Sequence, residues 1–586
     1  MESLRHDIRY TLRTLRKNPG FAAVAVLSLA LGIGANTAIF SIYSSIFLKK
    51  LPVEDTGSLV EIYTYELIEE IGLEYSVSSY RDYVDLQDQT TDVFEGMVIY
   101  NVTFVVFDTG EESEYIFGEE VSANYFDVLG VKPILGRTFI TEEEGVVGAA
   151  PTVVLSHSCW QNRFGGDPGI IGQAITLTGH DFTVIGVAPE EFEGLFPIIR
   201  SDVWYPITLD PLLHPDSRKL ESRSYRTNWI KGRLKAGVTP EQARAALEVV
   251  SARLEEEYPE TNEGRKALLI PTDEVSLHPF FDRVIKGFTF ALMAMVGLVL
   301  LIACTNLASM LLARALARRK EIGIRLAVGA SRFRLIRQLI TESILLSLAG
   351  GAVGLALAYL LIQILLTVQP PLLVTLNIHI GIDGYVLLFA LLLSVGTGVV
   401  FGLLPALKTT RYELTSALRN EYGLMVGRLR RLGLRSTLVV AQVAVSALLL
   451  ICAGLFLRSL GNASSVDPGF DLREGVVVTL ELSESGYTHE QSRAFFDELI
   501  ARVAALPGVE SAAMTDRMPL GQSIRITTVY PETPHVEIDE EGVSIDIATI
   551  GPNYFRTLGI PIRSGRPFNE TDLTEGEPVV IVNETL

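Results

Sequence analysis

Cysteine and tryptophan are scarce in this chain of 586 residues, which contains three of each. Cys304 and Cys452 fall inside long uncharged runs, so Cys159 is the one cysteine that lies elsewhere. The polar parts of the chain therefore cannot form a disulfide within themselves, and no pair of cysteines has the spacing of a zinc site. We expect Cys304 and Cys452 to be small apolar packing residues rather than redox groups.

Sequence motifs typical of catalytic, nucleotide-binding or metal-binding sites are also missing. The chain contains no Gly-x-x-x-x-Gly-Lys-Ser/Thr loop for ATP phosphates, no His-Glu-x-x-His, no Gly-x-Ser-x-Gly and no Cys-x-x-Cys. His157, His180 and His214 share one polar segment but lack the spacing of metal ligands. The sequence therefore predicts a protein that is not an enzyme, with no catalytic residue, no cofactor and no metal site.

Positive charge is in short supply, since 49 Lys and Arg residues face 69 Asp and Glu residues. Twenty of these 49 basic residues, but only five of the 69 acids, fall in the segments 1–20, 313–337 and 408–436. The rest of the chain is strongly acidic and would be repelled by a phosphate backbone, so nucleic acid is excluded as a partner.

Long uncharged runs are the most prominent feature that is present. A helix needs about 20 apolar residues to cross a bilayer. Five runs meet this length: Phe21–Leu48, Gly287–Leu312, Ser343–Val368, Tyr385–Leu407 and Thr437–Leu457. The sequence therefore predicts a multi-pass membrane protein.

The three basic segments fall on one side of the membrane when the five runs alternate across it. Because positive loops stay in the cytoplasm, the N-terminus is predicted to be cytoplasmic. A cleaved signal peptide is the alternative for the first run. The length of Phe21–Leu48 and the absence of small residues at Lys49-Lys50-Leu51-Pro52 favour a retained helix.

The first 20 residues are predicted to form an amphipathic helix on the inner leaflet. Leu4, Ile8, Leu12 and Leu15 recur at helical spacing, and arginines occupy another face. Apolar burial and anionic headgroups would hold such a helix at the lipid bilayer. A disordered basic flank is the alternative.

The chain repeats itself at an offset of 427 to 429 residues. Residues 123–131 return at 552–560, residues 136–139 at 565–568, and residues 151–155 at 578–582. A basic-flanked run precedes each copy, so the fifth run is interpreted as the first span of a second copy of the same unit. Because the second copy stops soon after its last repeated segment, we expect the natural protein to continue with three more spans.

The polar regions are predicted to be α/β domains. Residues 229–234, 239–258 and 267–271 are expected to form a strand, a helix and a strand, and residues 173–187 a hairpin. The tail is expected to repeat this order with a strand at Val476–Leu482, a helix at Thr488–Leu506 and a strand at Val509–Thr515. Both helices begin with a capping pattern.

The segment between the second and third runs carries a specific resemblance. Arg319-Lys320-Glu321-Ile322-Gly323-Ile324-Arg325, then Gly329-Ala330, Gln338, Glu342-Ser343 and Gly350-Gly351, resemble the cytoplasmic loop of MacB/FtsX-type ABC transporter permeases. In that family the loop contacts the ATPase as a coupling helix. The resemblance implies that the contact residues in this chain are Glu321, Gly323, Arg325, Gly329, Ala330 and Arg332.

The opening of the chain narrows the resemblance. Together with the duplication, two motifs are similar to the acidobacterial duplicated orphan permeases: Arg9…Leu12-Arg13…Leu15-Arg16-Lys17-Asn18-Pro19-Gly20-Phe21 and Leu31-Gly32-Ile33-Gly34-Ala35-Asn36-Thr37-Ala38-Ile39-Phe40. These permeases lack a fused ATPase. The implied fold is an α+β membrane protein with five transmembrane helices, large extracytoplasmic α/β domains of MacB periplasmic type and a duplicated permease unit.

The expected domains follow from these runs and loops. They are a cytoplasmic amphipathic helix at 1–20, transmembrane helices at 21–48, 287–312, 338–368, 385–407 and 437–457, a coupling loop at 313–337, a cytoplasmic linker at 408–436, and extracytoplasmic domains at 50–286 and 460–586, the second one incomplete.

The resemblance implies a permease in the bacterial inner membrane that works with a cytoplasmic ABC ATPase acting in trans. Its expected activity is export or extrusion, with a periplasmic adaptor or an outer-membrane channel as a further partner. The alternative is an FtsX-like regulatory protein that transmits force without transport.

Overall fold

The computed structural model describes most of the chain. The described residues are 2–49, 51–68, 73–108, 113–140, 143, 151–196, 199–214, 217–317, 324, 331–367, 380–410, 434–470, 475–480, 482, 487–519, 521, 526–529, 543–569, 572 and 578–585. They form two units, Met1–Leu455 and Phe456–Leu586, which are described separately.

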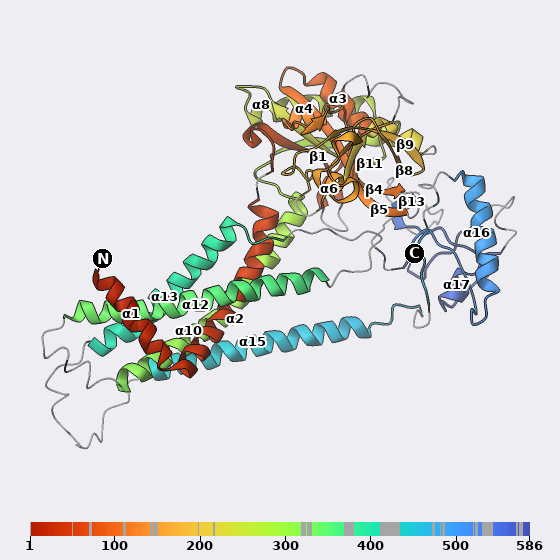
Figure 1. Cartoon of the computed structure of the whole chain (residues 1–586). Coiled ribbons are helices and arrows are strands. Elements are labelled where there is room, and N and C mark those ends of the chain that lie inside the picture. Colours follow the sequence, from red (N-terminus) through yellow and green to blue (C-terminus); the bar gives the residue numbers. More distant parts are fainter. Residues whose placement is uncertain are drawn as a thin grey trace. The chain divides into compact units, whose positions relative to one another are not determined.

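Five described helices are long and apolar enough to cross a membrane (Figure 1). They are α2 (Pro19–Phe47), α10 (Pro279–Ala317), α12 (Arg332–Thr367), α13 (Gly384–Thr410) and α15 (Leu434–Ser465). Each of the five uncharged runs lies within or largely within one of them. A shorter helix, α1 (Glu2–Arg16), precedes α2.

Two of the long helices begin well before the expected transmembrane segments. The helix α10 starts at Pro279 rather than at residue 287, and α12 starts at Arg332 rather than at residue 338. The Ser331 hydroxyl accepts a hydrogen bond from the N–H of Arg334 at 3.3 Å, which caps the start of α12. Polar helix ends of this kind carry no hydropathy signal, so the runs mark the membrane core and not the full helix.

The first polar region is built on one sheet with twelve strands among its described residues. The strands are β1 (Leu59–Ile68), β2 (Leu73–Ser76), β3 (Ser78–Ser79), β4 (Phe94–Asp108), β5 (Ser113–Val121), β6 (Leu135–Gly136), β7 (Thr152–Leu155), β8 (Ala174–Leu177), β9 (His180–Val187), β10 (Val203–Pro206), β11 (Arg226–Leu234) and β12 (Lys266–Pro271). The main path is β12-β1-β11-β4-β5-β10-β7-β9-β6.

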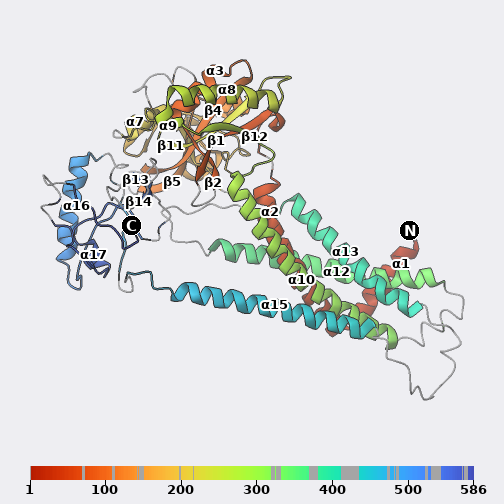
Figure 2. The same cartoon turned by 180° about the vertical axis from the view of Figure 1, so that it is seen from behind.

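Two helices cover the β12-β1-β11-β4 half of this sheet (Figure 1 and Figure 2). They are α3 (Tyr80–Gln89) and α8 (Pro240–Glu257), and their apolar faces share a core with the strands. The predicted strand–helix–strand order at 229–271 is confirmed as β11, α8 and β12. Thr239 and Gln242 form the predicted capping box.

The other half of the sheet forms a second core. The predicted hairpin at 173–187 is confirmed, because β8 pairs antiparallel with β9. The helix α6 (His157–Phe164) packs there, and its Cys159 is buried. Between the two cores, the short helix α4 (Tyr125–Leu129) places its aromatic side chains against Phe192 and Trp204.

The second unit contains the predicted helix but not the predicted strands. The helix α16 (His489–Ala504) begins at a capping box, as expected. Residues 476–480 are extended without a described ladder partner, and Val509–Thr515 contributes only an isolated bridge at Thr515. The two strand predictions are therefore wrong for the described residues. A strand is defined by its ladder hydrogen bonds, and the described residues 476–480 form none.

The internal repeat extends to single hydrogen bonds. Arg137 Nη2 donates to Glu143 Oε1 at 2.7 Å, and Arg566 Nη2 donates to Asp572 Oδ1 at 2.7 Å. In both copies a backbone N–H three residues before the acid also donates to it at 2.9 Å. The helix α17 (Tyr554–Thr557) likewise repeats α4. The two units therefore share one local fold.

Candidate functional site

The candidate site is the end of the helix bundle where the chain leaves α10 and returns as α12. Of the predicted contact residues, Glu321, Gly323, Arg325, Gly329 and Ala330 lie outside the described residues.

The described residues nearest to them are highly exposed. Arg332 is the first residue of α12 and is exposed. Ile324 is helical and 64% exposed, and Phe333 is 72% exposed. Exposed apolar side chains beside arginines are suited to a protein partner, because a large apolar side chain gains free energy when it is covered.

A buried ion pair joins the two helices that flank this loop. Arg314 Nη1 near the end of α10 lies 3.0 Å from Glu342 Oε1 on α12, and Glu342 is only 5% exposed. The Arg314 guanidinium also lies over the Phe21 ring of α2, 4.6 Å from its centroid. Because loss of one partner leaves the other charge buried and unpaired, the pair holds α10 and α12 together at the ends of the loop.

A second ion pair attaches α1 to the same place. Arg337 on α12 donates to Asp7 Oδ2 through Nε at 2.9 Å and through Nη2 at 2.8 Å. Among the residues of α1 whose burial is described, Asp7, Thr11 and Thr14 are buried. The surface of α1 that faces α12 is therefore polar.

The helix predicted at the start of the chain is present as α1. Leu12 is 52% exposed, Ile8 and Leu15 are partly buried, and the contact of this face with the inner leaflet stays a prediction. The contact through Asp7 was not predicted, although an acid in such a basic helix is the signal that could have revealed it.

Small residues bring α2 and α12 into close contact. A Cβ added to Gly34 would lie 2.8 Å from the carbonyl oxygen of Gly354, and one added to Gly350 would lie 2.7 Å from Leu29 Cβ. A methyl group has no room at these positions, so the glycines allow the two helices to pack closely. Asn36 Nδ2 also donates to Val296 O of α10 at 3.0 Å, as expected for a polar residue within a span.

The opposite end of α10 is fixed in the α/β domain. The His278 ring is 5% exposed and lies edge-on to Tyr63 and Trp229, with centroid distances of 5.3 and 5.7 Å. Asp282 accepts hydrogen bonds from the N–H groups of Ser276 and Leu277 at 2.8 and 3.0 Å. Burial lowers the pKa of His278. The first turn of α10 is thus part of the domain core.

One carboxyl group is fully buried inside the domain. Glu119 accepts hydrogen bonds from the hydroxyls of Ser201 and Tyr125 at 2.5 and 2.7 Å and from Trp204 Nε1 at 3.1 Å. Burial raises the pKa of Glu119, and these hydrogen bonds oppose that rise. Three side-chain donors surround Glu119, with no adjacent cation among the described residues, which is typical of a structural polar centre.

A cluster with the geometry of metal ligands also lies in this domain. Ligand atoms of Glu120, Asp210 and His214 lie within 4.8 Å of one another, which the spacing of the histidines did not reveal. Lys219 Nζ forms a buried ion pair with Glu120. The cluster therefore carries its own cation, and we interpret it as a structural ion pair.

Two family profiles match the chain. The MacB-like periplasmic core domain covers residues 22–250, and the FtsX-like permease C-terminal domain covers residues 293–414. The second match includes the end of α10, the loop and α12, and therefore contains the candidate site.

Curated relatives agree with both profiles. The macrolide export ATP-binding/permease protein MacB of Escherichia coli (strain K12) is 28% identical over 308 residues, which cover 51% of this chain and 43% of that protein. The MacB protein of Shigella sonnei (strain Ss046) matches to the same extent. The matched part is less than half the length of these relatives.

Solved structures give a weaker comparison. The periplasmic region of MacB from Actinobacillus actinomycetemcomitans has a TM-score of 0.28 at 14% identity, over 39% of this chain and 92% of that one. A score this low supports no conclusion by itself. The two family profiles and the long apolar helices identify this chain as a MacB/FtsX-type ABC transporter permease, a membrane protein with an extracytoplasmic domain.

Proposed function

We propose that this chain is the permease subunit of an ABC transporter in the bacterial inner membrane, and that a separate ATPase moves its extracytoplasmic domain from the cytoplasm. In this proposal the N-terminus and the loop at 313–337 are cytoplasmic. Twenty basic residues in the three segments on that side support this orientation.

The observation that carries the proposal is the continuity of α10. This helix runs for 39 residues from the core of the α/β domain to the loop. At about 1.5 Å per residue it is about 58 Å long, well beyond a bilayer core of about 30 Å. An unbroken helix fixed at both ends transmits a displacement of one end to the other.

Side-chain contacts hold both ends of α10. Beside the loop, Arg314–Glu342 holds α10 to α12, and Arg337–Asp7 holds α12 to α1. At the other end the His278 ring is buried among aromatic residues. A push on the loop by an ATPase therefore reaches the domain through α10, because neither end can slip independently.

The direction of transport is a proposal for this chain, and it is inferred from the names of its relatives. The relatives are named macrolide export proteins. We propose export or extrusion of a substrate that is already outside the inner membrane, with a periplasmic adaptor or an outer-membrane channel as a further partner.

The test is co-purification with ABC ATPases encoded near its gene, together with ATPase activity in lipid. We expect Glu321→Lys and Gly329→Trp to reduce ATPase association at least tenfold without loss of membrane insertion. An inverted charge and a large side chain both disrupt a close interface. Arg428→Gln, in the other basic segment, is the control.

The outcome separates two functions. If both substitutions leave association and activity unchanged, the loop is not the contact. If no ATPase associates with the wild type, the FtsX-like regulatory function replaces export.

A further inference from the structure

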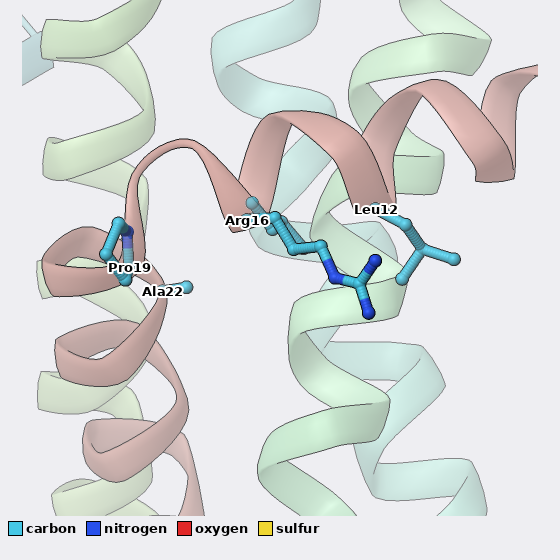
Figure 3. A pocket seen from close by; sticks show the side chains of 5 residues that line it. Leu12, Arg16, Pro19 and Ala22 are labelled. Atoms are coloured by element: carbon cyan, nitrogen blue, oxygen red, sulfur yellow. The ribbon is translucent and has the colours of Figure 1, made fainter.

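A hollow lies at the elbow between α1 and α2. It has a volume of about 460 Å³ and is lined by Leu12, Leu15 and Arg16 of α1 and by Pro19 and Ala22 of α2. Figure 3 shows the Leu12 and Arg16 side chains extending from α1 on the same side, with Pro19 and Ala22 at the start of α2. Four apolar side chains and one guanidinium suit a ligand that has both an apolar part and a negative charge.

The cation of this hollow is available. Arg16 is exposed and forms no ion pair with a residue that the structure describes. Asp7, the nearest acid along α1, is already neutralised by Arg337. Arg13 and Lys17 beside it are also exposed cations. The elbow therefore has an excess of positive charge and favours an anion.

The start of α2 adds a second attraction for an anion. The side chain of its N-cap residue, Asn18, does not cap the helix and instead donates to the carbonyl of Thr14 at 3.0 Å. The first N–H groups of α2 are thus left without a side-chain acceptor. Free N–H groups and the helix dipole stabilise negative charge at such a terminus, phosphate groups in particular.

The surroundings decide what kind of anion fits. Val24 and Leu27, one and two turns further along α2, are 46% and 59% exposed in a helix that crosses the membrane. Leu12 is 52% exposed at the hollow itself. These side chains need hydrocarbon around them, so the ligand must carry an acyl chain as well as a negative charge.

We propose that this elbow is a binding site for one anionic glycerophospholipid. Its phosphate contacts Arg16 at the start of α2, and one acyl chain lies along Leu12, Leu15 and Ala22. The proposed site adds a specific lipid to the predicted contact of α1 with the bilayer. It depends on α1 lying at the membrane surface, but not on any ATPase. A bound lipid would brace the helix that is tied to α12 through Arg337.

The experiment is native mass spectrometry of the whole chain in detergent with phosphatidylglycerol or phosphatidylcholine added. We expect the wild type to retain one phosphatidylglycerol in preference to phosphatidylcholine. Arg16→Gln should weaken that preference about fivefold, which is the effect of about one interfacial cation. Ala22→Phe, which fills the hollow, should abolish retention of either lipid.

Arg13→Gln is the matched control, because it removes an equal charge from α1 outside the hollow. Elution of each variant as a single species on size exclusion shows that it is folded. Equal losses for Arg13→Gln and Arg16→Gln would show diffuse attraction to the basic helix and overturn the site. Retention by Ala22→Phe equal to that of the wild type would overturn it as well. Because no ATPase is present, neither result bears on the coupling mechanism.

Discussion

At the scale of single residues, several buried charges have an oppositely charged partner. Arg314 pairs with Glu342 between spans, and Lys231 forms a buried ion pair with Glu61 in the sheet. Glu119 differs, since hydrogen-bond donors surround it and no cation does. A buried carboxylate without a counter-charge makes the stability of its domain depend on pH.

This gives a prediction for Glu119→Gln. The folded pKa of Glu119 is raised, so the folded state binds more protons than the unfolded state above the unfolded pKa of about 4.3. Its contribution to stability is therefore lost as pH rises from that value through the folded pKa. The substitution should flatten this slope by up to about 1.4 kcal/mol per pH unit, the limit for one proton.

Tryptophan fluorescence can measure this unfolding in the whole chain. All three tryptophans lie in the first α/β domain, at Trp160, Trp204 and Trp229. Glu191→Gln, at an exposed position, is the control and should leave the slope unchanged. An identical pH profile for the wild type and Glu119→Gln would contradict the assignment of a raised pKa to this group.

At the scale of elements, packing between spans depends on glycine. A Cβ at Gly354 would lie 3.1 Å from both the N–H nitrogen of Gly34 and the carbonyl oxygen of Ala30. The helices α2 and α12 are therefore in backbone contact here, and any side chain must separate them.

We expect Gly354→Ile to destabilise the bundle by at least about 1–3 kcal/mol, the usual cost of overpacking. Gly396→Ile on α13 is the control, since nothing lies within 4 Å of its added Cβ. The measurement is the melting temperature of the helical circular dichroism signal in detergent. Equal melting temperatures for the two variants would show that the α2–α12 contact is not a close one.

The elements differ in how far the sequence predicts them. The spans and the helices α8 and α16 were predictable because hydropathy and capping are local properties. The pairing of residues 476–482 was not predictable in this way, because a strand depends on partners far along the chain. Asp7 and Arg337 are 330 residues apart, so their contact has no sequence signal except an isolated acid in a basic helix.

At the scale of the whole molecule, coupling to a cytoplasmic ATPase requires one orientation in the membrane. Cysteine labelling tests it with an impermeant maleimide, in a background where the three native cysteines are replaced by alanine. Arg218→Cys in the α/β domain and Ser331→Cys before α12 are both at exposed positions. We expect Arg218→Cys to react in intact cells and Ser331→Cys to react only after permeabilisation. Reaction of Ser331→Cys from outside would reverse the topology.

We propose that α10 carries motion from the loop to the α/β domain as a rigid rod. Phe290→Pro interrupts this helix on an exposed side, since Phe290 is 77% exposed. A proline removes one backbone hydrogen bond and kinks the helix, while its neighbours keep the span in place. Phe290→Leu is the matched control.

The decisive measurement is the distance between spin labels at Val249→Cys in the α/β domain and Val353→Cys on α12, with the ATPase bound and ATP added. Both positions are exposed. We predict that ATP changes this distance in the wild type and in Phe290→Leu, and that Phe290→Pro loses the change while still binding the ATPase. An undiminished change in Phe290→Pro would contradict transmission through α10.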